Sequence, residues 1–215
     1  MLTVSVMFDP RILEPRDDDE FAEWTREVHR LVRVDTEFPD YPFRNDGFVF
    51  AFDRDSIVCR DVLYILEPLI ARYGDEFVTI WGLDQGNENF RGSFGYYPAF
   101  RVSTKDVANH YDDVFRDPLP SNNGQLPGLR YVTDTLTIVG SSGTWSIWSN
   151  WSLETALVHT PDLMLITEPK VWPSIKFTEQ TIRDELMPPQ PWWQAPEHLL
   201  REFFDNLRTH GHLPG

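Results

Sequence analysis

Residues 130–167 alternate short apolar segments with tight polar turns, and this spacing constrains the fold more than any other feature of the chain. The segments with strand character are 130–139, 144–148, 153–159 and 163–167. Only the turns 140–143 and 149–150 separate the first three of them. Connections this short join neighbouring antiparallel strands, so the pattern predicts a β-meander.

Helical periodicity marks three longer segments of the chain. They are 18–33, 57–73 and 196–209. The first begins at the acidic run 17–20, which supplies an N-cap and places negative charge at the positive end of the helix dipole. In the second, Pro68 predicts a kink or a break. Together these elements predict an α+β fold, a largely antiparallel sheet with three main helices packed on it.

The N-terminal part of the chain leaves the strand order open. A strand at 2–8, a helix and the apolar strand 48–52 would also suit a βαβ start over 1–81. The nearly unbroken apolar character of 48–52 predicts a central strand covered on both faces. We expect 1–215 to form one domain, and a subdomain boundary would fall in the polar stretch 117–128, which has three prolines and two glycines.

The chain is strongly acidic. Its 215 residues include 34 Asp and Glu against 19 Lys and Arg, a formal net charge of −15. Residues 1–120 hold 24 of the acidic and 13 of the basic side chains, so −11 of the excess lies there. Such a surface repels phosphate backbones and anionic lipids. The charge therefore argues against nucleic-acid and membrane binding and favours a basic protein partner.

The sequence contains no motif of a known catalytic or cofactor site. The turn 140–143 lacks the Gly-x-Ser-x-Gly spacing of a nucleophile elbow. The run 17–20 lacks the alternate spacing of a calcium loop, and the six histidines form no His-Glu-x-x-His pair. We therefore expect no catalytic residues, no metal and no cofactor. The single Cys59 and the absence of a signal-peptide pattern predict a reduced, cytoplasmic setting.

Eight tryptophans are many for a chain of this length. Three of them follow one another closely in 145–151, and two more stand between prolines at 192–193. Core packing and contact with a partner are both open for these side chains, because tryptophan serves in cores and as an interface anchor. The candidate partner-binding residues are Trp148, Trp151, Trp192 and Trp193 as anchors, with Asp17, Asp18, Asp19 and Glu20 as charges that steer association.

The segment Gly143–Trp148, followed after a turn by Trp151–Val158, is similar to sequences of small bacterial cytosolic proteins. These proteins include the immunity proteins of polymorphic-toxin systems. The resemblance implies a single-domain α+β protein without catalysis that blocks a cognate toxin by binding it. An acidic surface agrees with this, because complementary charge speeds the association of an inhibitor with a cationic toxin.

The sequence thus predicts a non-enzymatic acidic binding protein that captures and neutralises a basic protein partner, such as a toxin. One alternative is a carbohydrate-active or other hydrolase that uses paired carboxylates beside a tryptophan platform. Another is a structural component of a larger bacterial assembly. The sequence leaves open the identity of the partner, any small ligand and the oligomeric state.

Overall fold

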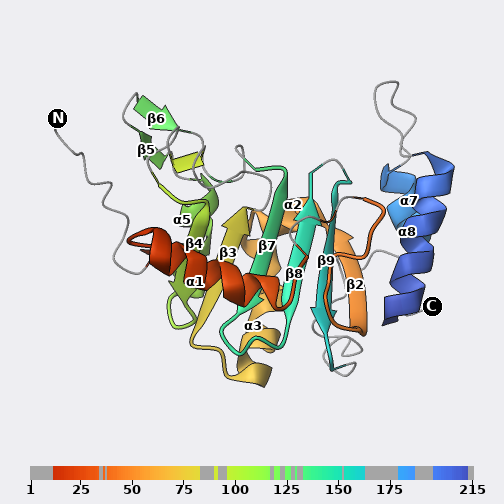
Figure 1. Cartoon of the computed structure of the whole chain (residues 1–215), viewed down its shortest axis with the longest axis horizontal. Coiled ribbons are helices and arrows are strands. Elements are labelled where there is room, and N and C mark those ends of the chain that lie inside the picture. Colours follow the sequence, from red (N-terminus) through yellow and green to blue (C-terminus); the bar gives the residue numbers. More distant parts are fainter. Residues whose placement is uncertain are drawn as a thin grey trace.

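The computed structural model places an eight-stranded sheet at the centre of the protein (Figure 1). It describes residues 12–33, 36, 38–82, 90–91, 96–116, 119–121, 124–126, 129, 133–151, 153–162, 179–186 and 196–212. The strands expected at 2–8 and 163–167 lie outside the described residues.

The sheet is antiparallel in all but one of its pairings. Its strands are β1 (Ile12–Leu13), β2 (Gly47–Asp53), β3 (Phe77–Gly82), β4 (Ala99–Ser103), β7 (Thr135–Gly140), β8 (Ser146–Asn150), β9 (Thr155–Thr160) and β10 (Gly211–His212). Their order is β1-β4-β3-β7-β8-β9-β2-β10, and only β2 and β10 pair in parallel. The predicted meander is confirmed as β7-β8-β9. A separate hairpin of β5 (Leu119–Ser121) and β6 (Gly124–Leu126) lies within 117–128.

The βαβ alternative describes the chain only in part. Four antiparallel steps separate β2 from β3, so these two strands run parallel, and the chain between them is helical. In a βαβ unit the two strands would commonly be neighbours, whereas here β7, β8 and β9 lie between them. The antiparallel arrangement therefore dominates, and the α+β prediction is confirmed.

Helices lie on both sides of the sheet. They are α1 (Asp18–His29), α2 (Arg54–Ile57), the 3-10 turn η1 (Arg60–Val62), α3 (Leu63–Tyr73), α5 (Val107–Arg116), α7 (Glu179–Leu186) and α8 (Glu197–His210). The helix expected at 57–73 is broken, but the break falls at 58–59 and not at Pro68. Pro68 lies inside α3, where its missing N–H removes only the bond to the carbonyl of the solvent-exposed Tyr64.

The sheet separates two hydrophobic cores. The front core lies between the sheet and the helices α1 and α8, and Phe21, Trp24 and Phe203 are among its large members. The back core lies between the sheet and the helices α3 and α5. Figure 1 shows α1 crossing the front of the sheet and α3 behind it. Each strand between the two cores therefore needs apolar side chains on both of its faces.

Strand β2 shows how the sequence meets this demand. Val49 and Ala51 enter the front core, and Phe50 and Phe52 enter the back core. Coverage of this strand on both faces is confirmed. Its predicted central position is wrong, because only the two-residue strand β10 lies beyond it. Helix α8 contributes to the front core beside β2, so a strand next to the edge is as buried as a central one.

A buried carboxylate joins the β7–β8 turn to the start of β3. Asp75 Oδ2 accepts a hydrogen bond from Trp145 Nε1 at 2.7 Å, and Asp75 Oδ1 accepts one from the N–H of Ser142 at 2.6 Å. A Cβ on Gly140 would lie 2.5 Å from Trp145 Nε1, so this close approach requires glycine. Trp145 is a member of the back core.

Replacing Asp75 with alanine should lower the free energy of unfolding by roughly 2–3 kcal/mol, because the buried Trp145 indole N–H and the N–H of Ser142 both lose their acceptor. The variant Asp75→Asn keeps one acceptor oxygen in almost the same volume and should lose less. Urea unfolding of the wild type and both variants measures these differences. Equal stability of Asp75→Ala and the wild type would contradict the role given to this carboxylate.

Candidate functional site

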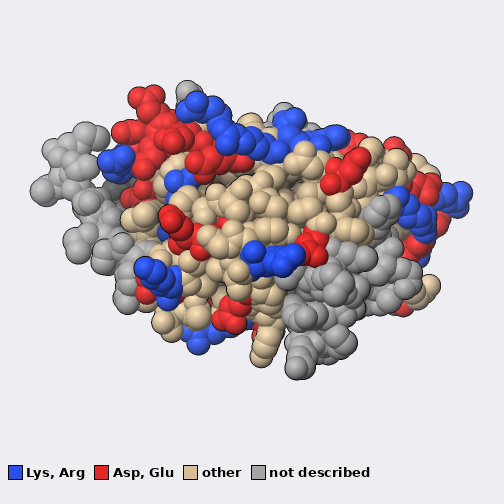
Figure 2. Space-filling model, turned by 90° about the horizontal axis from the view of Figure 1, so that it is seen from below, with Lys and Arg blue, Asp and Glu red and all other residues tan. Residues whose placement is uncertain are grey.

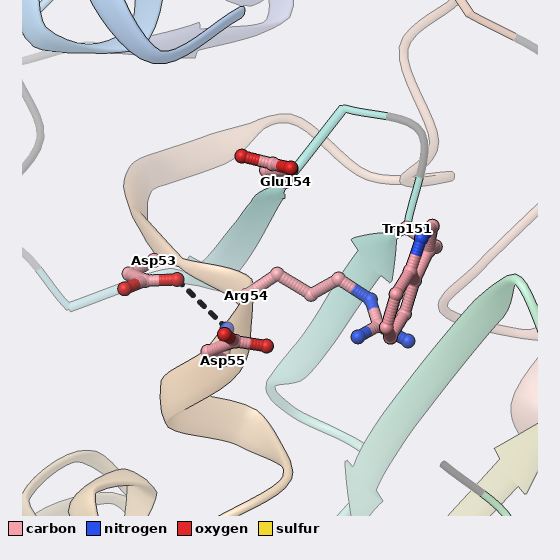
Figure 3. Close-up of a pocket in the computed structure, with 5 residues that line it drawn as sticks. All are labelled: Asp53, Arg54, Asp55, Trp151 and Glu154. Atoms are coloured by element: carbon pink, nitrogen blue, oxygen red, sulfur yellow. Dashed lines mark hydrogen bonds between the residues drawn. The ribbon is translucent and has the colours of Figure 1, made fainter. Parts of the chain in front are cut away.

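A recess opens where β8 turns into β9 and β2 leads into α2 (Figure 3). Its lining residues are Asp53, Arg54, Asp55, Trp151 and Glu154, and it encloses about 140 Å³. Sites for small-molecule ligands usually measure about 300–1,000 Å³. The recess therefore has room for one side chain of a partner rather than for a substrate of ordinary size.

Local backbone geometry brings the lining residues together. Asp53 ends β2 and caps α2, since its Oδ1 accepts a hydrogen bond from the N–H of Asp55 at 2.8 Å. The N–H of Arg54 donates to the carbonyl of Glu154 at 3.2 Å. Glu154 has a φ of 48°, the left-handed conformation that closes the turn after Trp151. The end of β2 and the β8–β9 turn are thus locked side by side.

Arg54 is a buried charge held against an exposed ring. Its Cζ lies 4.3 Å from the centroid of the Trp151 ring, within cation–π range. Trp151 keeps 43% of its surface exposed, whereas Arg54 is 2% exposed. Figure 3 shows the guanidinium alongside the indole. The guanidinium therefore orients the indole and leaves part of the ring open to a partner.

The recess is electronegative despite Arg54. The exposed residues Asp53, Asp55 and Glu154 line it together with one buried guanidinium. Carboxylates attract a cation directly, and the face of an indole attracts it through the ring quadrupole. The arrangement therefore suits a cationic group such as the end of a lysine or arginine side chain.

Of the four predicted tryptophan anchors, the structure describes Trp148 and Trp151, and only Trp151 is open to a partner. Trp148 is 2% exposed and belongs to the front core, because side chains alternate across β8 and this one points inward. Its prediction as a surface anchor is therefore wrong. Trp151 follows the last residue of β8 and escapes that alternation. Trp192 and Trp193 lie outside the described residues.

The acidic run at the start of α1 first serves the helix itself. Asp17 Oδ1 accepts a hydrogen bond from the N–H of Glu20 at 2.9 Å and so caps the helix, as expected for this run. Glu20 pairs with Arg16 at 2.8 Å across one turn. Two of the four predicted steering charges are thus engaged within the first turn.

Asp18 is engaged as well, beside the chain that leads into β4. It accepts a hydrogen bond from the Tyr97 hydroxyl and another from Arg91 Nη1 at 2.9 Å. The Tyr97 hydroxyl and the Arg91 charge hold the pKa of Asp18 below its usual value. Asp19 is exposed and has no ion-pair partner among the described residues. Because β3 and β7 lie between β4 and β8, the structure does not bring this run to the recess.

A group of polar side chains lies in the front core. Ser146 and His159 are direct partners across β8 and β9, and Trp148 follows Ser146 on the same face. Ser146 Oγ and Trp148 Nε1 are buried with no hydrogen-bond partner among the described residues, and the ring of His159 is buried near the Asn45 and Asp46 backbone. Phe43 stacks on His159 with ring centroids 5.0 Å apart. This group is closed to solvent and so offers no site to a partner.

Comparison with known proteins adds nothing to the geometry of the recess. No protein-family model, no curated protein and no solved structure matches the chain. Within the described residues, no helix is long and apolar enough to span a membrane. Across the same residues, no three His, Cys, Asp or Glu side chains gather as metal ligands.

Of the five lining residues, the sequence singles out only Trp151. Asp53-Arg54-Asp55 places one base between two acids directly after an apolar strand, which is a signal for a polar strand end. Glu154 carries no such signal, because its position depends on the left-handed turn that the β8–β9 pairing imposes.

Replacing Trp151 with alanine should lower the free energy of unfolding by about 1 kcal/mol, because Arg54 loses a cation–π contact worth about 0.5–2 kcal/mol. Trp151→Phe keeps a ring over the guanidinium and should lose less. Tyr64→Ala is a matched control, since Tyr64 is 65% exposed and should change stability by less than about 0.5 kcal/mol. Urea unfolding distinguishes the three variants, and equal effects at both positions would contradict the contact.

Stability should fall in mild acid because of His159. Burial lowers the pKa of His159 below its ordinary 6.5, against the opposing effects of the Asn45 and Asp46 backbone and the Asp46 charge. The unfolded chain therefore binds a proton first, and stability that is present above pH 6.5 is lost as the pH falls from there toward the folded pKa. His159→Leu should flatten this slope in urea unfolding between pH 7 and 5. An unchanged slope would show that other groups cause it.

Proposed function

We propose that this protein is a non-enzymatic, acidic binding protein that captures and neutralises a basic protein partner, as an immunity protein or inhibitor does. The observation that carries the proposal is the recess at Trp151, which three acidic residues and an exposed indole line and which has room for one side chain. A lysine or arginine of the partner would enter this space and meet carboxylates and the open part of the indole.

The fixed position of Trp151 supports this role. Ordering a mobile side chain on binding costs about 0.5–1.5 kcal/mol. Here Arg54 already holds the indole at 4.3 Å, so the ring meets the partner with little further loss of freedom. Tryptophans placed in this way are frequent binding hot spots, with losses above about 2 kcal/mol on truncation.

Long-range charge supports the same partner. A formal net charge of −15 attracts a basic protein over distances beyond direct contact. Such attraction acts mainly on the association rate and weakens as salt shortens the Debye length, from about 10 Å at 0.1 M to about 3 Å at 1 M. The local site and the overall charge thus favour one kind of partner.

The hydrolase alternative receives less support from the same residues. Trp145 and Trp148, two of the tryptophans that could form the platform of such an enzyme, are both buried in the cores. Carboxylates do lie beside Trp151, but Asp53 is engaged as the cap of α2. The recess, at about 140 Å³, is also small for a sugar substrate. A binding role needs neither an open tryptophan platform nor room for a sugar, and so agrees better with the recess.

The proposed setting is the bacterial cytoplasm, where the free Cys59 thiol would stay reduced. The resemblance of 143–158 to immunity proteins supports that setting and the neutralising role. Trp192 and Trp193 remain predicted anchors.

The test is affinity capture from the native lysate with the wild type, with Trp151→Ala and with the double variant Asp55→Asn/Glu154→Gln. The double variant Asp61→Asn/Glu67→Gln removes the same charge from exposed positions elsewhere and is the matched control. We expect the wild type and the control to retain the same basic protein. Both recess variants should weaken its binding by tenfold or more, and its association should slow as salt rises.

Two results would contradict the proposal. One is a partner with an acidic isoelectric point that is retained equally in high salt. The other is a basic partner that both recess variants bind as tightly as the control does.

A further inference from the structure

Four exposed arginines gather where α1 ends. Arg26 and Arg30 lie on the last part of α1, and Arg33 follows it. Arg44 joins them because 31–33 and 42–44 run side by side: the N–H of Arg33 donates to Pro42 at 2.8 Å and the N–H of Arg44 donates to Leu31 at 2.9 Å. We call Arg26, Arg30, Arg33 and Arg44 the arginine patch.

The arginine patch differs from eight other described arginines in having no carboxylate partner. Ion pairs with Asp or Glu hold Arg16, Arg60, Arg72, Arg91, Arg101, Arg183, Arg201 and Arg208. None of the four patch arginines makes an ion pair within the described part of the chain. Glu27, one turn before Arg30, pairs with Arg101 instead. In a chain with fifteen excess negative charges, four neighbouring unpaired arginines are unexpected.

Helix stability explains only part of the arginine patch. Positive charge near the end of a helix is favoured by the dipole within the last turn. Arg33 and Arg44 lie beyond that turn. The acidic start of the same helix does not neutralise the patch either. Asp19 and Arg30 are eleven residues apart, about 16 Å along the axis, which is twice the Debye length of about 8 Å at physiological salt.

Charge is therefore separated along this part of the surface. Figure 2 shows carboxylates gathered toward one end of the upper edge and a band of Lys and Arg side chains next to them. Antiparallel pairing of α1 with a second copy would match these charges. Exposed ion pairs contribute only about 0.2–1 kcal/mol each, however, against an association cost of about 4–15 kcal/mol. A second copy is therefore a poor occupant.

We infer that the arginine patch binds a compact anion that carries two or more phosphate groups. Guanidinium groups match phosphate oxygens in pairs of hydrogen bonds, and Arg26 and Arg30 stand one turn apart with Cβ atoms about 5–6 Å from each other. A compact anion keeps its charge over the patch. A nucleic acid or a lipid surface would extend its charge over the acidic remainder of the protein and be repelled. This inference does not depend on the proposed function.

The experiment is isothermal titration of the whole protein with inorganic tripolyphosphate at 50 mM salt, with EDTA present to remove metal ions. We expect the double variant Arg30→Gln/Arg33→Gln to bind at least tenfold more weakly than the wild type. The control Arg201→Gln/Arg208→Gln removes the same charge from α8 and should stay within twofold. Urea midpoints check that all three proteins fold.

A second arm compares inorganic pyrophosphate with ADP. Equal affinity for the two compounds would identify a free polyphosphate as the ligand, and tighter binding of ADP would identify a nucleotide. Both outcomes support the inference. Three results would overturn it: no tripolyphosphate binding below millimolar concentration, equal weakening in both double variants, or equally tight binding of a hexaglutamate peptide.

Discussion

The register of the β7–β8–β9 meander decides the chemistry that the protein presents. In that register Trp148 stands between Thr137 and Leu157 and points into the front core. A slip of one residue would reverse every inward and outward position on these strands. The same pairing ends β8 before Trp151, which is why this tryptophan is available at the surface. Burial of one indole and exposure of the other thus have a single cause.

The secondary structure could largely be predicted from local patterns. Apolar spacing and the acidic N-cap locate α1, and the two short turns give the meander, because both depend on residues close in sequence. The position of β2 next to the edge could not be predicted in this way. Its burial depends on α8, which follows almost 150 residues later in the chain. A strand covered by a distant helix has the same sequence pattern as a central one.

The site could be predicted less well than the fold, for a related reason. The recess combines the end of β2 with a turn about one hundred residues away, and its one predicted member is Trp151. The number of charged residues in a segment of the sequence also says little about how many of those charges are available to an outside partner. Asp17, Asp18 and Glu20 look like one acidic surface, yet each has a partner within the protein. The sequence pattern does not single out the arginine patch, because its members are spread over 26–44 in an acidic chain. The pairing of 31–33 with 42–44 brings Arg44 to the other three.

The two ends of the sheet share a feature with a bearing on solubility. In the described part of the chain, the sheet ends on each side in a strand of two residues, β1 beside β4 and β10 beside β2. A long bare edge strand offers a row of backbone donors and acceptors on which another chain can add, and so promotes aggregation. Each of these short strands covers only part of its neighbour: β10 pairs with Gly47 and Phe48 of β2, and β1 pairs with Arg101 and Val102 of β4. Among the described strands, the rest of β2 therefore keeps an edge with no strand partner, on which backbone pairing with another chain could add to contacts made by side chains.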